Sequence, residues 1–141
     1  MRKPVAFLVL VVVALFAGSA FAAGVCPQDR KTPAAPSASD DQTAGADAAV
    51  GKALYEKDAK PMACMNCHGM AGDGAGKLGA ALKPNPRNFT CAETMKDISA
   101  GQMFFVIKNG SPNTGMVAHG KTLNDKQIWD VIKYIRTTFV K

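Results

Sequence analysis

The feature that most constrains this chain of 141 residues is the pentapeptide Cys64-Met65-Asn66-Cys67-His68. Two thiols three residues apart can lie on one helical turn, where both can add to the two vinyl groups along one edge of a haem. The imidazole that follows then lies under the iron and can bind it through nitrogen. The spacing therefore predicts one covalently attached haem c, held by Cys64 and Cys67 and ligated by His68.

Three other interpretations of this motif need features that the rest of the sequence does not supply. A structural zinc site needs four ligands, and the remaining candidates are only Cys26, Cys91 and His119. A thioredoxin-like redox pair needs a βαβ context, and no segment alternates convincingly as a strand. A plain disulfide within the motif would give its histidine no role. We therefore favour haem.

An iron bound by His68 has a second axial position, and the chain offers His119 and several methionines to fill it. Met116 is the predicted ligand, because residues 109–116 form a turn-rich loop that can fold over the opposite haem face. A thioether is a soft ligand that raises the reduction potential of haem iron. His119 is expected to be a surface residue. The other methionines of the domain are expected to fill gaps around the haem: Met62, Met70, Met95 and Met103.

The N-terminus has the pattern of an export signal. Residues 1–22 combine a basic start at Arg2 and Lys3 with an apolar run and a small-residue cleavage pattern, and they are predicted to be a signal peptide. An uncleaved membrane anchor is the alternative, because residues 4–25 carry no charge over a length that can span a bilayer. In both cases the rest of the chain is exported, so we expect a periplasmic protein, either free or membrane-tethered.

The exported part divides into a leader and one small domain. Residues 23–46 are rich in Ala, Ser and Pro and contain no aromatic residue, so we expect a disordered leader or linker. Residues 47–141 hold 13 Lys and Arg against 8 Asp and Glu, a net charge of +5. A domain of under about 100 residues is too small for a large substrate-cleft enzyme and gains stability from a cofactor.

Within the domain, the apolar periodicity predicts helices joined by long loops. Asp47 can cap a first helix, Ser99 a second over residues 100–109, and Asn124 a last helix with apolar residues at i, i+3, i+4 and i+7 spacing. The stretch 69–90 is rich in Gly and Pro and is expected to be loop. The predicted fold class is therefore all-α.

At these residues the chain resembles the class I monohaem c-type cytochromes of bacterial periplasms, over about residues 47–141. The matching residues include CMNCH, Gly51, Tyr55, the run 68–74, Gly115, Met116 and the run 129–136. The resemblance implies three to five helices wrapped around one covalently bound haem. It also implies that the N- and C-terminal helices cross, with Gly51 and Tyr55 packed against Val131 and Tyr134.

A haem iron with both axial positions filled by protein has no place for a substrate, so we expect one-electron transfer and not catalysis. The positive domain is expected to be a monomer that meets redox proteins with acidic docking surfaces, membrane-bound complexes among them. Nucleic acid and small-molecule substrates are not expected. The alternatives are an open-site haem protein, such as a peroxidase-like enzyme or a gas or redox sensor, and a haem subunit of a larger oxidoreductase.

Arg87 and the two remaining cysteines carry expectations that the sequence leaves open. Arg87 is a candidate partner for a haem propionate, because a guanidinium pairs well with a partly buried carboxylate, and the alternative is a surface arginine. Cys26 and Cys91 suggest a disulfide in an oxidising compartment. Free thiols or an intermolecular bridge are the alternatives for this pair.

Overall fold

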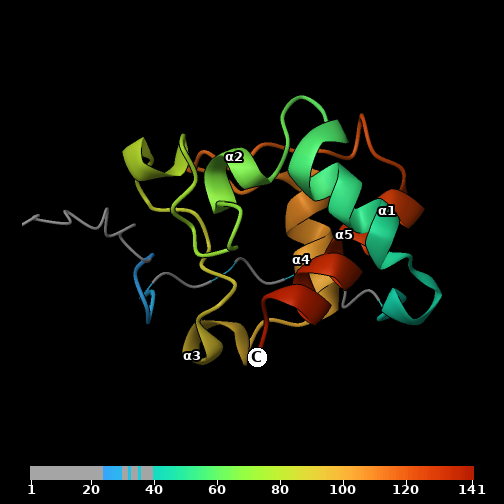
Figure 1. Cartoon of the computed structure of the whole chain (residues 1–141), viewed down its shortest axis with the longest axis horizontal. Helices are drawn as coiled ribbons and strands as arrows, with labels where there is room; N and C mark the ends of the chain where they lie inside the picture. Colours follow the sequence, from blue (N-terminus) through green and yellow to red (C-terminus); the bar gives the residue numbers. More distant parts are fainter. Residues whose placement is uncertain (1–23, 30–31, 33–34, 36–39) are drawn as a thin grey trace, which may run out of the picture.

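The computed structural model describes residues 24–29, 32, 35 and 40–141. The predicted signal peptide or anchor, residues 1–22, lies outside the described residues, as does part of the predicted linker. Every regular element in the described part is helical, which confirms the all-α prediction (Figure 1). None of the described helices combines the length and the apolar character that crossing a membrane requires.

The described residues form five α-helices and three further helical segments. The α-helices are α1 (Ala48–Ala53), α2 (Met65–His68), α3 (Ala92–Met95), α4 (Ala100–Asn109) and α5 (Asp125–Thr138). Two 3-10 helices cover Thr43–Gly45 and Gly79–Ala81, and a π-helical segment, Leu54–Asp58, continues α1. In Figure 1, α1, α4 and α5 lie together on one side, while α2 and α3 lie on the other with the loops that join them.

The predicted helix boundaries are confirmed where the sequence carries a capping signal. Asp47 accepts hydrogen bonds from two backbone N–H groups of the first turn of α1. Ser99 and Asn124 each form a capping box with the glutamine three residues later, at the starts of α4 and α5. Helix α4 ends at Asn109, and Gly110, which follows it, has a φ of 76° that suits a residue without a side chain.

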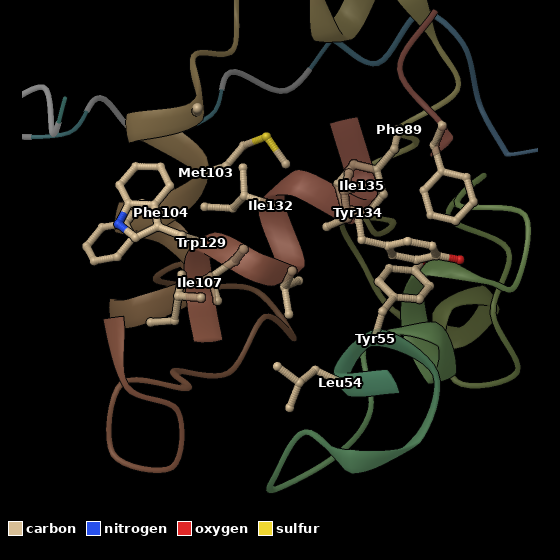
Figure 2. Packing of buried hydrophobic residues seen from close by; sticks show 14 of the residues in the cluster. Leu54, Tyr55, Phe89, Met103, Phe104, Ile107, Trp129, Ile132, Tyr134 and Ile135 are labelled. Carbon is tan, nitrogen blue, oxygen red and sulfur yellow. The ribbon is translucent and has the colours of Figure 1, made fainter. Parts of the chain in front are cut away.

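Helices α1 and α5 cross at very close range, as the family resemblance implies. A Cβ atom on Gly51 would overlap the backbone oxygen of Asp130 and would lie 3.0 Å from Cβ of Tyr134. The rings of Tyr55 and Tyr134 have centroids 5.4 Å apart (Figure 2). The predicted crossing is therefore confirmed, with Asp130 as the residue nearest Gly51, while Val131 lies fully buried beside it.

Helix α5 supplies much of the core and packs against both α1 and α4. Trp129 of α5 stacks on Phe104 of α4, with ring centroids 4.6 Å apart (Figure 2). Phe139, just beyond α5, packs against the rings of Tyr55 and Tyr134. The buried apolar residues of α5 are Ile128, Trp129, Val131, Ile132, Tyr134 and Ile135. The three helices thus form one firmly packed half of the domain.

The glycine-rich stretch after α2 is loop, apart from the short helix Gly79–Ala81. Gly69, Gly72 and Gly74 have φ values of 81°, 70° and 81°, which residues with side chains rarely adopt. These turns fold the chain back on α2, so that the backbone N–H of Phe89 donates to the oxygen of Gly72. The loop thereby brings residues 86–89 beside His68.

Residues 24–29 lie against the domain, which the composition of the predicted linker did not indicate. A disulfide joins Cys26 to Cys91, so the intramolecular pairing left open by the sequence is present in the structure. The backbone N–H of Gln28 donates to the hydroxyl of Thr94, and its side-chain amide donates to the oxygen of Pro86, 2.8 Å away. Cross-linking and hydrogen bonds, and not apolar burial, hold this segment.

Candidate functional site

The two cysteines of the motif lie on one turn of chain at α2. The backbone N–H groups of Cys67 and His68 donate to the oxygen of Cys64, at 3.2 and 2.9 Å, which winds the motif into a helix. Neither cysteine takes part in a disulfide. Both cysteines and His68 line the same cavity. The local geometry is therefore the one that the motif spacing predicts.

His68 is held as a neutral imidazole. Its Nδ1 lies 2.9 Å from the backbone oxygen of Arg87, which can only accept, so Nδ1 carries the proton and Nε2 keeps its lone pair. Burial lowers the pKa of His68 to about 4. The ring also stacks on Phe89, with centroids 4.5 Å apart. A neutral, oriented imidazole is the form that binds a metal.

The chemistry of the two thiols does not favour the alternatives to haem. Burial raises the pKa of Cys64 to about 12 and also raises the pKa of Cys67, so both thiols are protonated near neutral pH. A redox-active CxxC pair has a lowered thiol pKa instead. Across the described ranges, no group of three or more His, Cys, Asp or Glu side chains is placed to hold a metal ion. The zinc interpretation therefore gains no ligand set.

The cavity beside the motif suits an apolar group. Its apolar lining comes from the segment before α2, from the loop 82–89, from α3, α4 and α5, and from the link between α3 and α4. The lining includes Met62, Leu82, Phe89, Met95, Ile98, Met103, Val106, Ile107, Val131 and Ile135. Two thiols and a neutral imidazole share the cavity with these side chains. This combination of an apolar enclosure with two attachment points and a nitrogen donor fits a covalently attached haem.

The structure places Met116 in the same cavity as His68 and the two cysteines. Its loop is fixed by hydrogen bonds: the backbone N–H of Met116 donates to the hydroxyl of Thr114 at 3.0 Å, and its oxygen accepts from the N–H of Ser111 at 3.0 Å. A loop held in this way presents the thioether without requiring a helix. The four residues predicted to attach and ligate the haem are thus brought together.

The expectation that His119 lies on the surface is wrong. His119 is only 3% exposed and lines the cavity. Its Nδ1 donates to the oxygen of Lys60 at 2.8 Å, and its backbone N–H donates to the oxygen of Ile107 in α4. These bonds turn the side chain inward and connect the loop of Met116 to the segment before Cys64. No local pattern indicates this, because Lys60 lies 59 positions away in the chain.

The methionines predicted to surround the haem divide into two groups. Met62, Met95 and Met103 line the cavity, as expected. Met70 does not, and its side chain is 61% exposed, so the prediction is wrong for this residue. Met70 follows directly after Gly69, where the positive φ turns the chain away from the end of α2.

Arg87 lines the cavity next to the N-terminal segment. Its Nη2 donates to the hydroxyl of Thr32 at 2.8 Å, and its Nη1 donates to Oε1 of Gln28 at 3.4 Å. Arg87 is half-buried, and Thr32 also lines the cavity. The sequence singled out Arg87, but it gave no signal that residues of the predicted linker would lie beside it.

Comparison with known proteins identifies a family and similar folds. The family model described as Cytochrome c matches residues 48–139. Solved structures with a similar fold include a chain of the Kuenenia stuttgartiensis reducing HAO-like protein complex Kustc0457/Kustc0458 and the KustC0563 c-type cytochrome. No curated protein matches the sequence.

The two structural likenesses differ in coverage. The chain of the HAO-like complex has a TM-score of 0.56 and 21% identity, and the match covers 79% of the present chain and 50% of that chain. The KustC0563 cytochrome has a TM-score of 0.52 and 23% identity, and the match covers 67% of the present chain and 99% of that chain. The present chain thus spans half the length of the first of them, and at these identities the likeness shows a shared fold.

Proposed function

The chain belongs to the cytochrome c family and so carries covalently bound haem c, and on that premise we propose that it is a one-electron carrier. In this proposal the haem is attached through Cys64 and Cys67, and its iron is ligated by His68 and Met116. The observation that carries the proposal is that these four side chains line the same apolar cavity. The haem supplies the redox chemistry, which is the gain or loss of one electron.

The residues of the chain contribute orientation and exclusion of water. The hydrogen bond from His68 to the oxygen of Arg87 fixes the plane of the imidazole and increases the basicity of its free nitrogen. The bonds of Met116 to Thr114 and Ser111 hold the second ligand loop. The apolar lining would keep water from a bound haem iron, so that little would have to rearrange when its charge changes. A site with both axial positions filled has none left for a substrate.

The ligation by Met116 is tested by comparing Met116→Ala with Met70→Ala. The wild-type ferric protein is expected to show a low-spin spectrum with a sulfur-to-iron charge-transfer band. Met116→Ala is expected to lose this band, and its ferrous form to bind carbon monoxide readily. Met70→Ala is the matched control, because its exposed thioether lies outside the cavity, and it should keep the band. A band that survives in Met116→Ala, or rapid carbon monoxide binding by the wild type, would contradict the proposal.

We further propose that the protein is exported to the periplasm and exchanges electrons with protein partners. The support is the export pattern of residues 1–22 and the net charge of +5 in residues 47–141, which would draw acidic docking surfaces toward the carrier. Cell fractionation and the intact mass of the mature protein test the export, since the mass reports both the cleavage of residues 1–22 and the attached haem.

The second candidate function is that of a haem subunit in a larger oxidoreductase. The observation that favours it is the likeness to a chain of an HAO-like protein complex. Native mass measurement of the protein purified from its own cells separates the two functions. A monomeric haem protein supports the free carrier, and a stable association with other subunits supports the alternative.

A further inference from the structure

The N-terminal strap, by which we mean residues 24–29 together with Thr32, is fastened to the domain at α3. Its Cys26 is bonded to Cys91, the residue that precedes α3 and is only 2% exposed. The backbone N–H of Gln28 donates to the hydroxyl of Thr94 at 3.1 Å. The strap is therefore attached at two successive points before it reaches the cavity.

From this anchor the strap supports the loop of residues 86–88 on both sides of Arg87. The side-chain amide of Gln28 donates to the oxygen of Pro86 at 2.8 Å, and its Oε1 accepts from the backbone N–H of Asn88 at 3.0 Å. The side chain of Asn88 donates in turn to the oxygen of Gly24 at 3.2 Å. Asn88 is buried. The strap thus satisfies polar groups that this loop would otherwise leave unpaired.

The supported loop carries the groups that matter for the haem. The oxygen of Arg87 accepts the hydrogen bond of His68, and the guanidinium of Arg87 donates to the hydroxyl of Thr32 at 2.8 Å. Both Thr32 and Arg87 line the cavity. Among the described residues that line the cavity, Arg87 is the one lysine or arginine.

We propose that the strap completes the haem site, with Thr32 and Arg87 together binding a haem propionate. The proposal rests on the proposed attachment at Cys64 and Cys67, because thioether bonds there would use the vinyl groups of the macrocycle and leave its carboxylates for other residues of the same cavity. A guanidinium has five donors, so its bonds to the strap are compatible with a further bond to a carboxylate. The hydroxyl of Thr32, which accepts from Arg87, donates its own proton to the same carboxylate.

The charge of a propionate favours the ferric state, and donors that compensate this charge favour the ferrous state. Removal of the Thr32 hydroxyl in Thr32→Val is therefore expected to move the equilibrium toward ferric iron. The expected change is roughly fivefold, which corresponds to about 1 kcal/mol, the size of one hydrogen bond. Redox titration of the purified holoprotein measures this change. Thr137→Val is the matched control, because the hydroxyl of Thr137 bonds to the oxygen of Lys133 within α5.

Two further comparisons make the test specific to the strap. Replacement of both disulfide cysteines in Cys26→Ser/Cys91→Ser removes the cross-link of the strap, leaves its hydrogen bonds, and is expected to shift the equilibrium in the same direction as Thr32→Val. In an Arg87→Gln background, Thr32→Val should have little additional effect, because the two residues act on one carboxylate.

The outcomes separate the strap from the axial ligation. A sulfur-to-iron band that is absent in the wild type contradicts ligation by Met116 and says nothing against the strap. A band that is present throughout, with Thr32→Val no different from Thr137→Val in the titration, overturns the strap proposal. If the double serine variant does not fold, the Thr32→Val comparison still decides, because that variant keeps both cysteines.

Discussion

Replacement of Gly51 by alanine tests whether the close crossing of α1 and α5 determines the stability of the domain. The added Cβ would overlap backbone atoms of Asp130 and would lie 3.0 Å from Cβ of Tyr134. Backbone atoms cannot rotate away as the end of a side chain can. The two helices must therefore move apart, which also loosens the packing of Tyr55 on Tyr134.

The expected size of the effect is a difference between two opposing contributions. Alanine is better than glycine within a helix by about 1 kcal/mol. Overpacking of a well-packed contact typically costs about 1–3 kcal/mol, and an overlap with backbone belongs in the upper part of that range. The net loss in the free energy of unfolding is therefore about 1–2 kcal/mol. For a domain of this size, that loss lowers the Tm by roughly 5–15 °C.

Thermal unfolding of the holoprotein, followed by circular dichroism, measures this loss. Gly45→Ala is the control, because no atom beyond its chain neighbours lies within 4 Å of the Cβ position there. The Tm of this control should stay unchanged or rise slightly. If Gly51→Ala proves as stable as wild type, the helices tolerate a wider separation, and the reasoning from the crossing is refuted.

Three further predictions concern single groups. Tyr55→Phe removes the buried hydroxyl that donates to the oxygen of Gly69 at 2.8 Å, and it should lower the free energy of unfolding by about 1–3 kcal/mol in guanidinium titration, with no change in the haem spectrum. Asn124→Ala removes the capping box with Gln127 and should cost about 1 kcal/mol in the same assay, and a cost near zero would mean that the cap is dispensable. Burial lowers the pKa of His68 from the 6.5 of an exposed imidazole to about 4, so below pH 6.5 the unfolded chain binds more protons at this residue. Folding stability should therefore fall by up to about 3 kcal/mol toward pH 4, and iron ligation of the same imidazole acts in the same direction. A denaturation midpoint that stays constant over this range would contradict the burial of His68.

Helices with local start and stop signals could be predicted from the sequence. Ser99 and Gly110 bound α4 at the expected residues, and Asn124 begins α5 as predicted. These signals act between residues three or four positions apart, so they do not depend on the rest of the fold. The crossing at Gly51 was predicted from family resemblance and not from such a signal.

The candidate site likewise has parts that local sequence signals predict and parts that depend on residues remote in the chain. The motif at α2 fixes the relative positions of its cysteines and histidine locally, so its geometry could be predicted from spacing. The presence of Met116 in the cavity was predicted from the turn-rich loop, and its ligation of iron stays a prediction. His119 was mispredicted because its partner, the oxygen of Lys60, is remote in sequence.

The N-terminal strap shows why composition alone was insufficient. Its sequence has little to bury, which is typical of a linker. The structure holds it through the disulfide to Cys91 and through the polar contacts of Gln28. Such contacts are specific to individual atoms and leave no periodic pattern in the sequence.

The pairing of α1 with α5 has a consequence for the order in which the domain can assemble. These helices lie near opposite ends of the domain, at Ala48–Ala53 and Asp125–Thr138. Their contact closes a long loop. The free-energy cost of that closure is offset only by the contacts that α5 itself makes. A chain that leaves the ribosome or a translocation pore from its N-terminus cannot complete this pairing until α5 has emerged, so the domain should assemble only after residues 125–138 are free of the ribosome or pore.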